Sequence, residues 1–145
     1  MSTLLKFKEN QEFKSFSLAD ENNVIKSLED FKGKPIYLGF WSNTSIPSLR
    51  ELKVIKVLNE KYGEKIHFIS INLDKAPNSM VTTKTKYGFN WTFLHYGNDY
   101  ELRERYDIRT VPTYFLIDSD GRLIQSHAKG PVKIEKTLYN LTKVN

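Results

Sequence analysis

The stretch Phe40-Trp41-Ser42-Asn43-Thr44-Ser45-Ile46-Pro47-Ser48 decides the fold of this chain. It stands between an apolar run at residues 35–41 and a segment whose apolar residues recur at helical spacing. A nearly continuous apolar run is typical of a strand that is buried on both faces of a sheet. The stretch therefore predicts a turn from a central strand directly into a helix that carries Ser45 and Ser48 near its start.

The segment after this turn is expected to be a helix of about four turns. Pro47 is tolerated in a first helical turn, and Gly63 supplies a stop at the other end. The apolar stripe of the helix consists of Leu52, Ile55, Leu58 and Tyr62. A hydroxyl at Ser45 can cap the helix, and Ser48 with Glu51 three residues later matches a capping box. Capping alone would therefore explain the serines without any chemistry.

The rest of the chain reads as further strands and helices of one α/β domain. The patterns predict an edge hairpin at residues 16–18 and 24–28, a strand at 66–73, a helix at 78–87, an extended piece at 91–95, helical turns at 100–106, a hairpin at 113–117 and 122–124, and a helix at 132–141. The long helical crossover between the first two central strands implies parallel pairing. We expect a mixed sheet with helices on both faces, in a single domain at 1–145 with an N-terminal extension at 1–12.

Composition excludes several kinds of function. The chain has 145 residues and no cysteine, so it can form neither disulfides nor thiolate metal sites. The net charge is +5, but Lys and Arg alternate with Glu and Asp along the sequence, which argues against nucleic-acid binding. His67, His95 and His127 stand on separate segments without metal-ligand spacing. We therefore expect no metal, no cofactor and no nucleic acid.

The N-terminal residues 1–11 lack the apolar core of a secretory signal. No apolar run approaches the roughly 20 residues that span a bilayer, so we expect no membrane insertion by this chain. The protein is either not exported or begins after a signal that has been removed.

Three motifs stand at matching separations along the chain: Phe40-Trp41 before the loop, Ser45-Ile46-Pro47-Ser48 at the helix start, and Val111-Pro112-Thr113 before the second hairpin. Residues 28–35 and 114–121 add further matches. In this order they resemble the thioredoxin fold, most closely the TlpA/ResA-like branch of the AhpC/TSA-related thioredoxins. The resemblance runs from about residue 16 to residue 141.

The resemblance implies that Ser45 and Ser48 occupy the positions of the two catalytic cysteines of the family. A serine oxygen cannot form or exchange a disulfide, so the chain as written cannot run the dithiol cycle of a thiol-disulfide oxidoreductase. Gly39 stands where thioredoxins carry a buried acid, and Thr44 where the branch usually has an aromatic residue. Both departures weaken the case for an intact catalytic loop.

The resemblance also implies a groove that binds peptides. The family's loop proline is cis, which corresponds to Pro112, and the backbone before it, here Val111, pairs with a substrate peptide. The other expected groove residues lie around the loop: Trp41, Thr44, Ile46 and Pro47. Trp41 would be a partly exposed platform, with burial against the helix as the alternative, and Pro112 could equally serve only as a rigid turn.

Two functional hypotheses remain from the sequence. The first is a redox-inactive module that binds a protein or peptide in this groove, as a monomer. The second is a thiol-disulfide oxidoreductase whose two cysteines have been replaced by serine. The family's usual setting would place either one outside the bacterial cytoplasm, in the periplasm.

Overall fold

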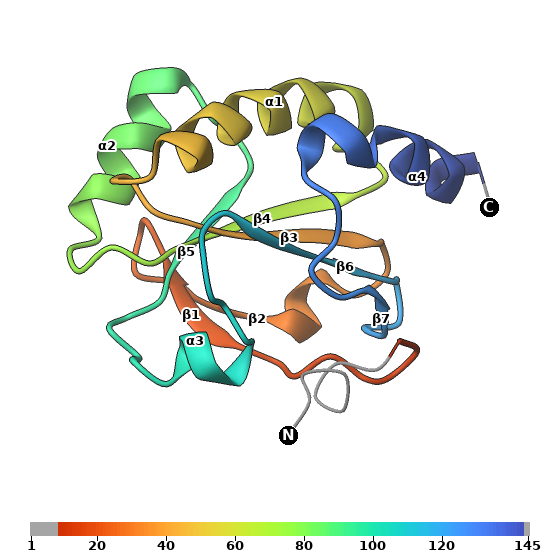
Figure 1. The fold of residues 1–145 in the computed structure, drawn as a ribbon, viewed down its shortest axis with the longest axis horizontal. Helices are drawn as coiled ribbons and strands as arrows, with labels where there is room; N and C mark the ends of the chain where they lie inside the picture. The colour runs from red at the N-terminus through yellow and green to blue at the C-terminus, as the bar shows by residue number, and fades with distance from the viewer. Residues whose placement is uncertain (1–8, 144–145) are drawn as a thin grey trace.

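The computed structural model describes residues 9–143, which build a seven-stranded mixed sheet. The strands are β1 Ser17–Asp20, β2 Ile25–Ser27, β3 Ile36–Trp41, β4 His67–Asn72, β5 Thr92–His95, β6 Thr113–Ile117 and β7 Leu123–Gln125. The helices are a 3-10 turn at Leu28–Phe31, α1 Ile46–Tyr62, α2 Asn78–Tyr87, α3 Leu102–Arg105 and α4 Pro131–Lys143. The strand order across the sheet is β2-β1-β5-β4-β3-β6-β7 (Figure 1).

β3 is an interior strand of the sheet, as the apolar run predicts. All residues of β3 are buried, and the strand pairs with β4 in parallel and with β6 in antiparallel orientation. Gly39 lies opposite Ser70 on β4 and opposite Tyr114 on β6. The right-handed crossover through α1 places the helix start at the carboxyl end of β3, beside the start of β6.

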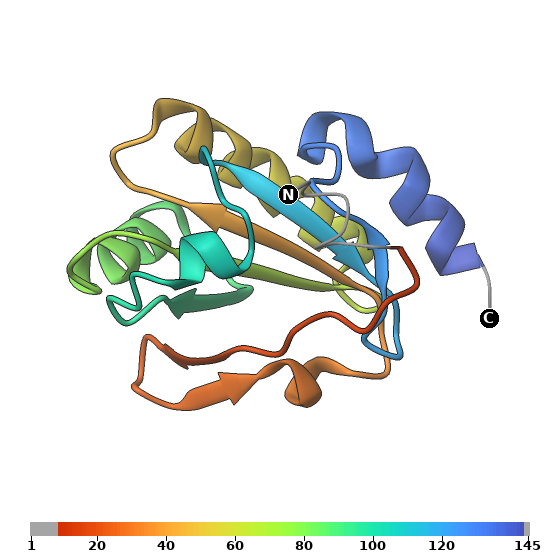
Figure 2. The same cartoon turned by 60° about the horizontal axis from the view of Figure 1, so that its bottom comes forward.

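Two apolar layers cover the two faces of the sheet, which confirms the predicted architecture. Helices α1, α2 and α4 pack on one face, where Leu52, Met80 and Ile134 share a cluster with aromatic residues of the sheet. On the other face lie α3, the 3-10 turn and the chain before β1 (Figures 1 and 2). Within residues 9–143, no helix is both long and apolar enough to cross a membrane.

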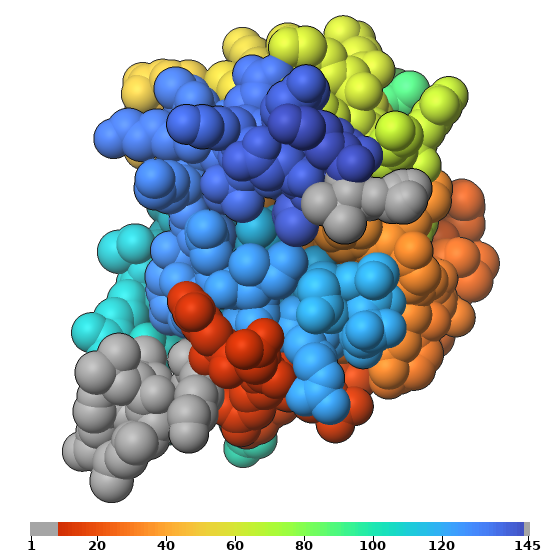
Figure 3. Space-filling model, turned by 90° about the vertical axis from the view of Figure 1, so that its right-hand side faces the viewer, coloured from red at the N-terminus to blue at the C-terminus, as the bar shows by residue number. Residues whose placement is uncertain are grey.

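The described part of the N-terminal extension is joined to the second hairpin. The Asn10 amide donates to the Leu123 carbonyl at 2.8 Å, and Glu12 bridges to Arg122. The aromatic ring of Phe13 is buried, where it stacks on Tyr106 and contacts Phe115 at a tilt. Figure 3 shows this red segment lying against the light-blue hairpin. The predicted extension at 1–12 is thus tied down over residues 10–12, while residues 1–8 lie outside the described chain.

Candidate functional site

The start of α1 contacts the loop before β6 through Ser45. Ser45 is the N-cap, and its Oγ accepts a hydrogen bond from the Ser48 amide at 3.1 Å, which confirms the predicted cap. The same hydroxyl donates to the Val111 carbonyl at 3.4 Å. The peptide bond between Val111 and Pro112 is cis. The fold therefore brings together the loop and the Val-Pro motif, which are 66 residues apart along the chain.

Ser48 lies inside the first turn of α1, and the capping box expected for it is wrong. Its side chain is only 1% exposed, and its Oγ accepts a long hydrogen bond of 3.4 Å from the Ser42 amide. Glu51 instead accepts a hydrogen bond from the Tyr114 hydroxyl at 2.8 Å. The helix begins at Ile46, so Ser48 stands at the third helical position and not at the cap. Its hydroxyl is closed to solvent.

The surface around Ser45 is apolar and open. Ile46 is 69% exposed, and Thr44 and Pro47 are exposed beside it. Val111 and Pro112 are half-buried at the neighbouring loop. We call these five residues, together with Ser45, the groove residues.

Trp41 does not belong to this open surface. Its side chain is 2% exposed and packs edge-to-face on Phe93, with ring centroids 5.8 Å apart. The expected partly exposed platform is therefore wrong, because the last residue of β3 points under the helices. The indole Nε1 is buried and has no acceptor among the described residues. Trp41 can affect the groove only through packing.

Asp74 is a site residue that the sequence reasoning placed only as the end of a strand. Its Oδ1 accepts a hydrogen bond from the Ser42 hydroxyl at 2.6 Å. Its Oδ2 accepts from the Asn43 amide, the Asn72 side chain and the Ser79 hydroxyl at 2.8 to 2.9 Å. The carboxylate thus fastens the loop before α1 to the loop before α2. A lone aspartate after a strand carries no pattern that would reveal such a network.

The hydrogen bonds outweigh burial in setting the charge of Asp74. Burial alone would raise its pKa, but the donors from Ser42, Asn72, Asn43 and Ser79 hold the pKa below its usual range. The carboxylate is therefore ionised at neutral pH. Its partners Ser42 and Asn43 belong to the loop before Ser45, so a charged group holds this loop in place.

Tyr114 occupies the space that a larger residue at position 39 would need. A Cβ on Gly39 would come within 2.7 Å of the Tyr114 ring. The ring stacks on Tyr37 at a centroid distance of 5.0 Å. Burial raises the pKa of both tyrosines, so their hydroxyls stay protonated and donate, Tyr114 to Glu51 and Tyr37 to the Lys129 carbonyl. Tyr114 therefore stands where a side chain at position 39 would point.

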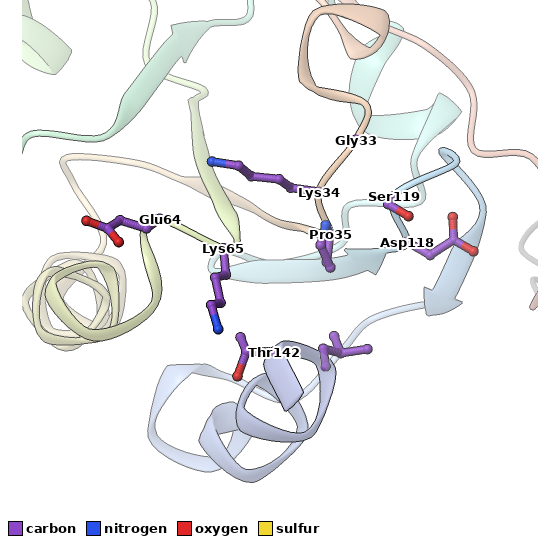
Figure 4. Close-up of a pocket in the computed structure, with 9 residues that line it drawn as sticks. Gly33, Lys34, Pro35, Glu64, Lys65, Asp118, Ser119 and Thr142 are labelled. Atoms are coloured by element: carbon purple, nitrogen blue, oxygen red, sulfur yellow. The ribbon is translucent and has the colours of Figure 1, made fainter. Parts of the chain in front are cut away.

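A cavity of about 230 Å³ opens beside Pro112. Its lining includes Glu51, Tyr114 and His127. A second cavity of about 540 Å³ lies between the end of α1 and α4, where Figure 4 shows Lys65 pointing toward Thr142. This second cavity is lined by different residues from the groove. Among residues 9–143, no group of three His, Asp or Glu side chains could hold a metal ion.

Comparisons with known proteins agree with this geometry. The family model described as Thioredoxin-like matches residues 33–123. The thiol-disulfide oxidoreductase ResA of Bacillus thuringiensis subsp. konkukian (strain 97-27) is 29% identical over 135 residues, covering 92% of this chain and 77% of ResA.

Two solved structures come from Bacteroides vulgatus, and each is described as a candidate thiol-disulfide oxidoreductase. The crystal structure has a TM-score of 0.84 at 28% identity and covers 97% of this chain and 99% of that one. The solution structure has a TM-score of 0.79 at 34% identity and covers 96% of this chain and 91% of that one.

Proposed function

The chain belongs to the thioredoxin-like family, and from this membership we propose that it is a redox-inactive module that binds a peptide segment of a partner protein in the groove. Its fold is the thioredoxin fold, and its relatives include proteins named thiol-disulfide oxidoreductases. In this proposal the protein has the peptide-binding surface of the family but does not transfer electrons.

The redox part of the proposal rests on the chemistry of the helix start. Disulfide exchange needs a thiolate to attack and a second sulfur to resolve the mixed disulfide. The chain contains no cysteine. The Ser45 oxygen instead accepts the Ser48 amide as a helix cap, and Ser48 is closed to solvent. Both hydroxyls therefore serve the structure of the loop.

The observation that carries the binding part is the exposed Ile46, which follows Ser45 directly, together with the hydrogen bond from the Ser45 hydroxyl to the Val111 carbonyl. Binding of a partner that removes this large aliphatic side chain from water lowers the free energy of the complex. An extended peptide that pairs with the backbone at Val111 would bury Ile46 and Pro47 at the same time. Specificity would then come from side chains that face Thr44 and the cavity beside Pro112.

The test uses linear peptides selected from a displayed random library against the whole chain. Isothermal titration measures their affinity for the parent protein, for Ile46→Glu and for the control Ile25→Glu. Ile25 is 60% exposed and lies on β2, across the sheet from the groove, so it matches Ile46 in type and exposure. We expect roughly tenfold weaker binding for Ile46→Glu and no change for the control. Equal binding by all three proteins would refute the groove.

The second candidate is a thiol-disulfide oxidoreductase with cysteines at positions 45 and 48 in the natural protein. The names of the relatives favour it. The mass of the peptide spanning Trp41 to Arg50, from protein of the native source, distinguishes serine from cysteine at both positions. A chain with Ser45→Cys and Ser48→Cys, assayed for reduction of a protein disulfide, then tests whether the rest of the loop supports turnover.

Two further expectations belong to the same proposal. The protein acts as a monomer, and, as the resemblance implies, it works outside the bacterial cytoplasm. Light scattering behind a sizing column gives the mass in solution. Fractionation of native cells gives the compartment.

A further inference from the structure

The positive charge of the chain gathers on one face of the molecule. Helices α1, α2 and α4 contain nine of the 22 basic residues but only three of the 17 acidic ones, which are Glu51, Glu60 and Glu135. The three helices pack on the same face of the sheet (Figure 1). The remainder of the chain is close to neutral. Basic and acidic residues alternate along the sequence, but in the folded chain the basic residues of these three helices form one basic surface.

Three lysines converge on Tyr87 at the end of α2. The Lys53 and Lys86 ammonium groups lie 4.8 and 5.3 Å from the centre of the Tyr87 ring. The Lys56 ammonium donates to the Tyr87 carbonyl at 3.1 Å. Within residues 9–143, none of these lysines forms an ion pair with a carboxylate, whereas Lys61 pairs with Glu135 at 2.6 Å. We call Lys53, Lys56 and Lys86 the lysine cluster.

The lysine cluster carries like charges that a bound anion would neutralise. Two ammonium groups share one aromatic ring, and no ion pair with a carboxylate in the described part of the chain offsets their electrostatic repulsion. Val57 stands one turn beyond Lys53 on α1 and is 54% exposed. Lysines beside an exposed aliphatic side chain match a partner that carries both carboxylates and apolar groups.

We propose that the lysine cluster docks an acidic segment of a partner protein. The three lysines gather around one residue at the end of α2, so their charge is concentrated at one place, which suits a narrow chain better than a flat membrane. Lys53 lies eight residues after Ser45 along α1, or about 12 Å. A partner bound in the groove could reach the cluster, but the cluster binds acidic chains whether or not the groove is occupied.

The probe is a fluorescently labelled peptide of about eight glutamates, which in extended form spans roughly the length of α1. Anisotropy at low salt measures its affinity for the whole chain, for the double variant Lys53→Glu/Lys86→Glu, and for the control Lys133→Glu/Lys136→Glu. The control makes the same charge change with two exposed lysines of α4. We expect about tenfold weaker binding for the cluster variant and a much smaller loss for the control.

Several results would overturn the proposal. Equal losses in both double variants would show general attraction to a basic protein, and absence of binding by the parent chain would exclude the site. Binding only to vesicles that contain phosphatidylserine, or only to a single-stranded oligonucleotide, would assign the cluster to that partner instead. Urea unfolding confirms that the variants are folded. Ile46→Ser, which removes the exposed aliphatic side chain without adding a charge, should leave the affinity for the glutamate peptide unchanged, and this separates the proposal from that of the groove.

Discussion

At the scale of single residues, Gly39 and Tyr114 are coupled across the sheet. Because a Cβ on Gly39 would lie 2.7 Å from the Tyr114 ring, Gly39→Ala must displace a buried, stacked tyrosine. We predict that Gly39→Ala lowers the free energy of unfolding by about 1 to 3 kcal/mol. In a Tyr114→Leu background the same change should cost clearly less, because the clash is removed. Urea unfolding of the four proteins measures the coupling, and an equal cost in both backgrounds would show that the contact does not matter.

This contact also limits which side chains position 39 can carry. An acid at position 39 would need the space that Tyr114 fills. The departure from the family pattern is spread over a strand pair and is not confined to the two serines.

The carboxylate of Asp74 predicts how stability responds to acid. A carboxyl whose pKa is lower in the folded than in the unfolded chain stabilises the fold above its unfolded pKa, and this contribution is lost as pH falls through the folded pKa. In Asp74→Asn, an NH2 group replaces one carboxylate oxygen. This group is a hydrogen-bond donor and cannot accept from donors such as the Ser79 hydroxyl. We predict a loss of about 2 kcal/mol at neutral pH.

The difference between the parent and Asp74→Asn should shrink when the pH is lowered below the usual range of an aspartate, since the parent then loses its charge too. Thermal unfolding across this range, with Asp120→Asn as an exposed control, checks the sign. A difference that grows on acidification would contradict the assignment.

At the scale of elements, the two serines of α1 should differ in their effect on the helix. Ser45→Ala removes the N-cap and should lower the free energy of unfolding by about 1 kcal/mol. Ser48→Ala loses only a hydrogen bond of 3.4 Å and gains helix propensity, so we expect a change below about 0.5 kcal/mol. Denaturant unfolding of both variants provides the comparison. A larger loss for Ser48→Ala would restore the capping role that the sequence suggested for it.

The elements themselves were largely predictable, because their signals are local. The apolar run of β3, the stripe of α1 and the turn before β7 depend on neighbours in the sequence, and the structure confirms all three. Trp41 and Asp74 were not predictable, since their surroundings come from other elements. Trp41 is covered by the helices, and Asp74 collects donors from residues 42 to 79. The groove residues were placed through the family resemblance and not through any local rule.

At the scale of the whole molecule, folding turns scattered positions into surfaces. The basic face arises because the two crossover helices and the last helix pack on the same side of the sheet, and no sequence window contains it. The groove arises likewise from a helix start and a loop that are distant in sequence. If both surfaces bind the same partner, they fix its orientation. An apolar extended segment of the partner would then lie at the start of α1, and an acidic segment would lie farther along this helix.

The beginning of the described chain packs against the last hairpin, far from it in the sequence. Phe13 is buried against Tyr106 and Phe115, and its amide donates to the Gly121 carbonyl at 3.0 Å. We predict that Phe13→Ala lowers the free energy of unfolding by about 3 to 5 kcal/mol, as expected of a core aromatic residue. Tyr100→Ala, at an exposed ring, should change it by less than about 0.5 kcal/mol. If urea unfolding finds Phe13→Ala as mild as this control, the segment before β1 is an appendage, and the core under the sheet begins at Phe16.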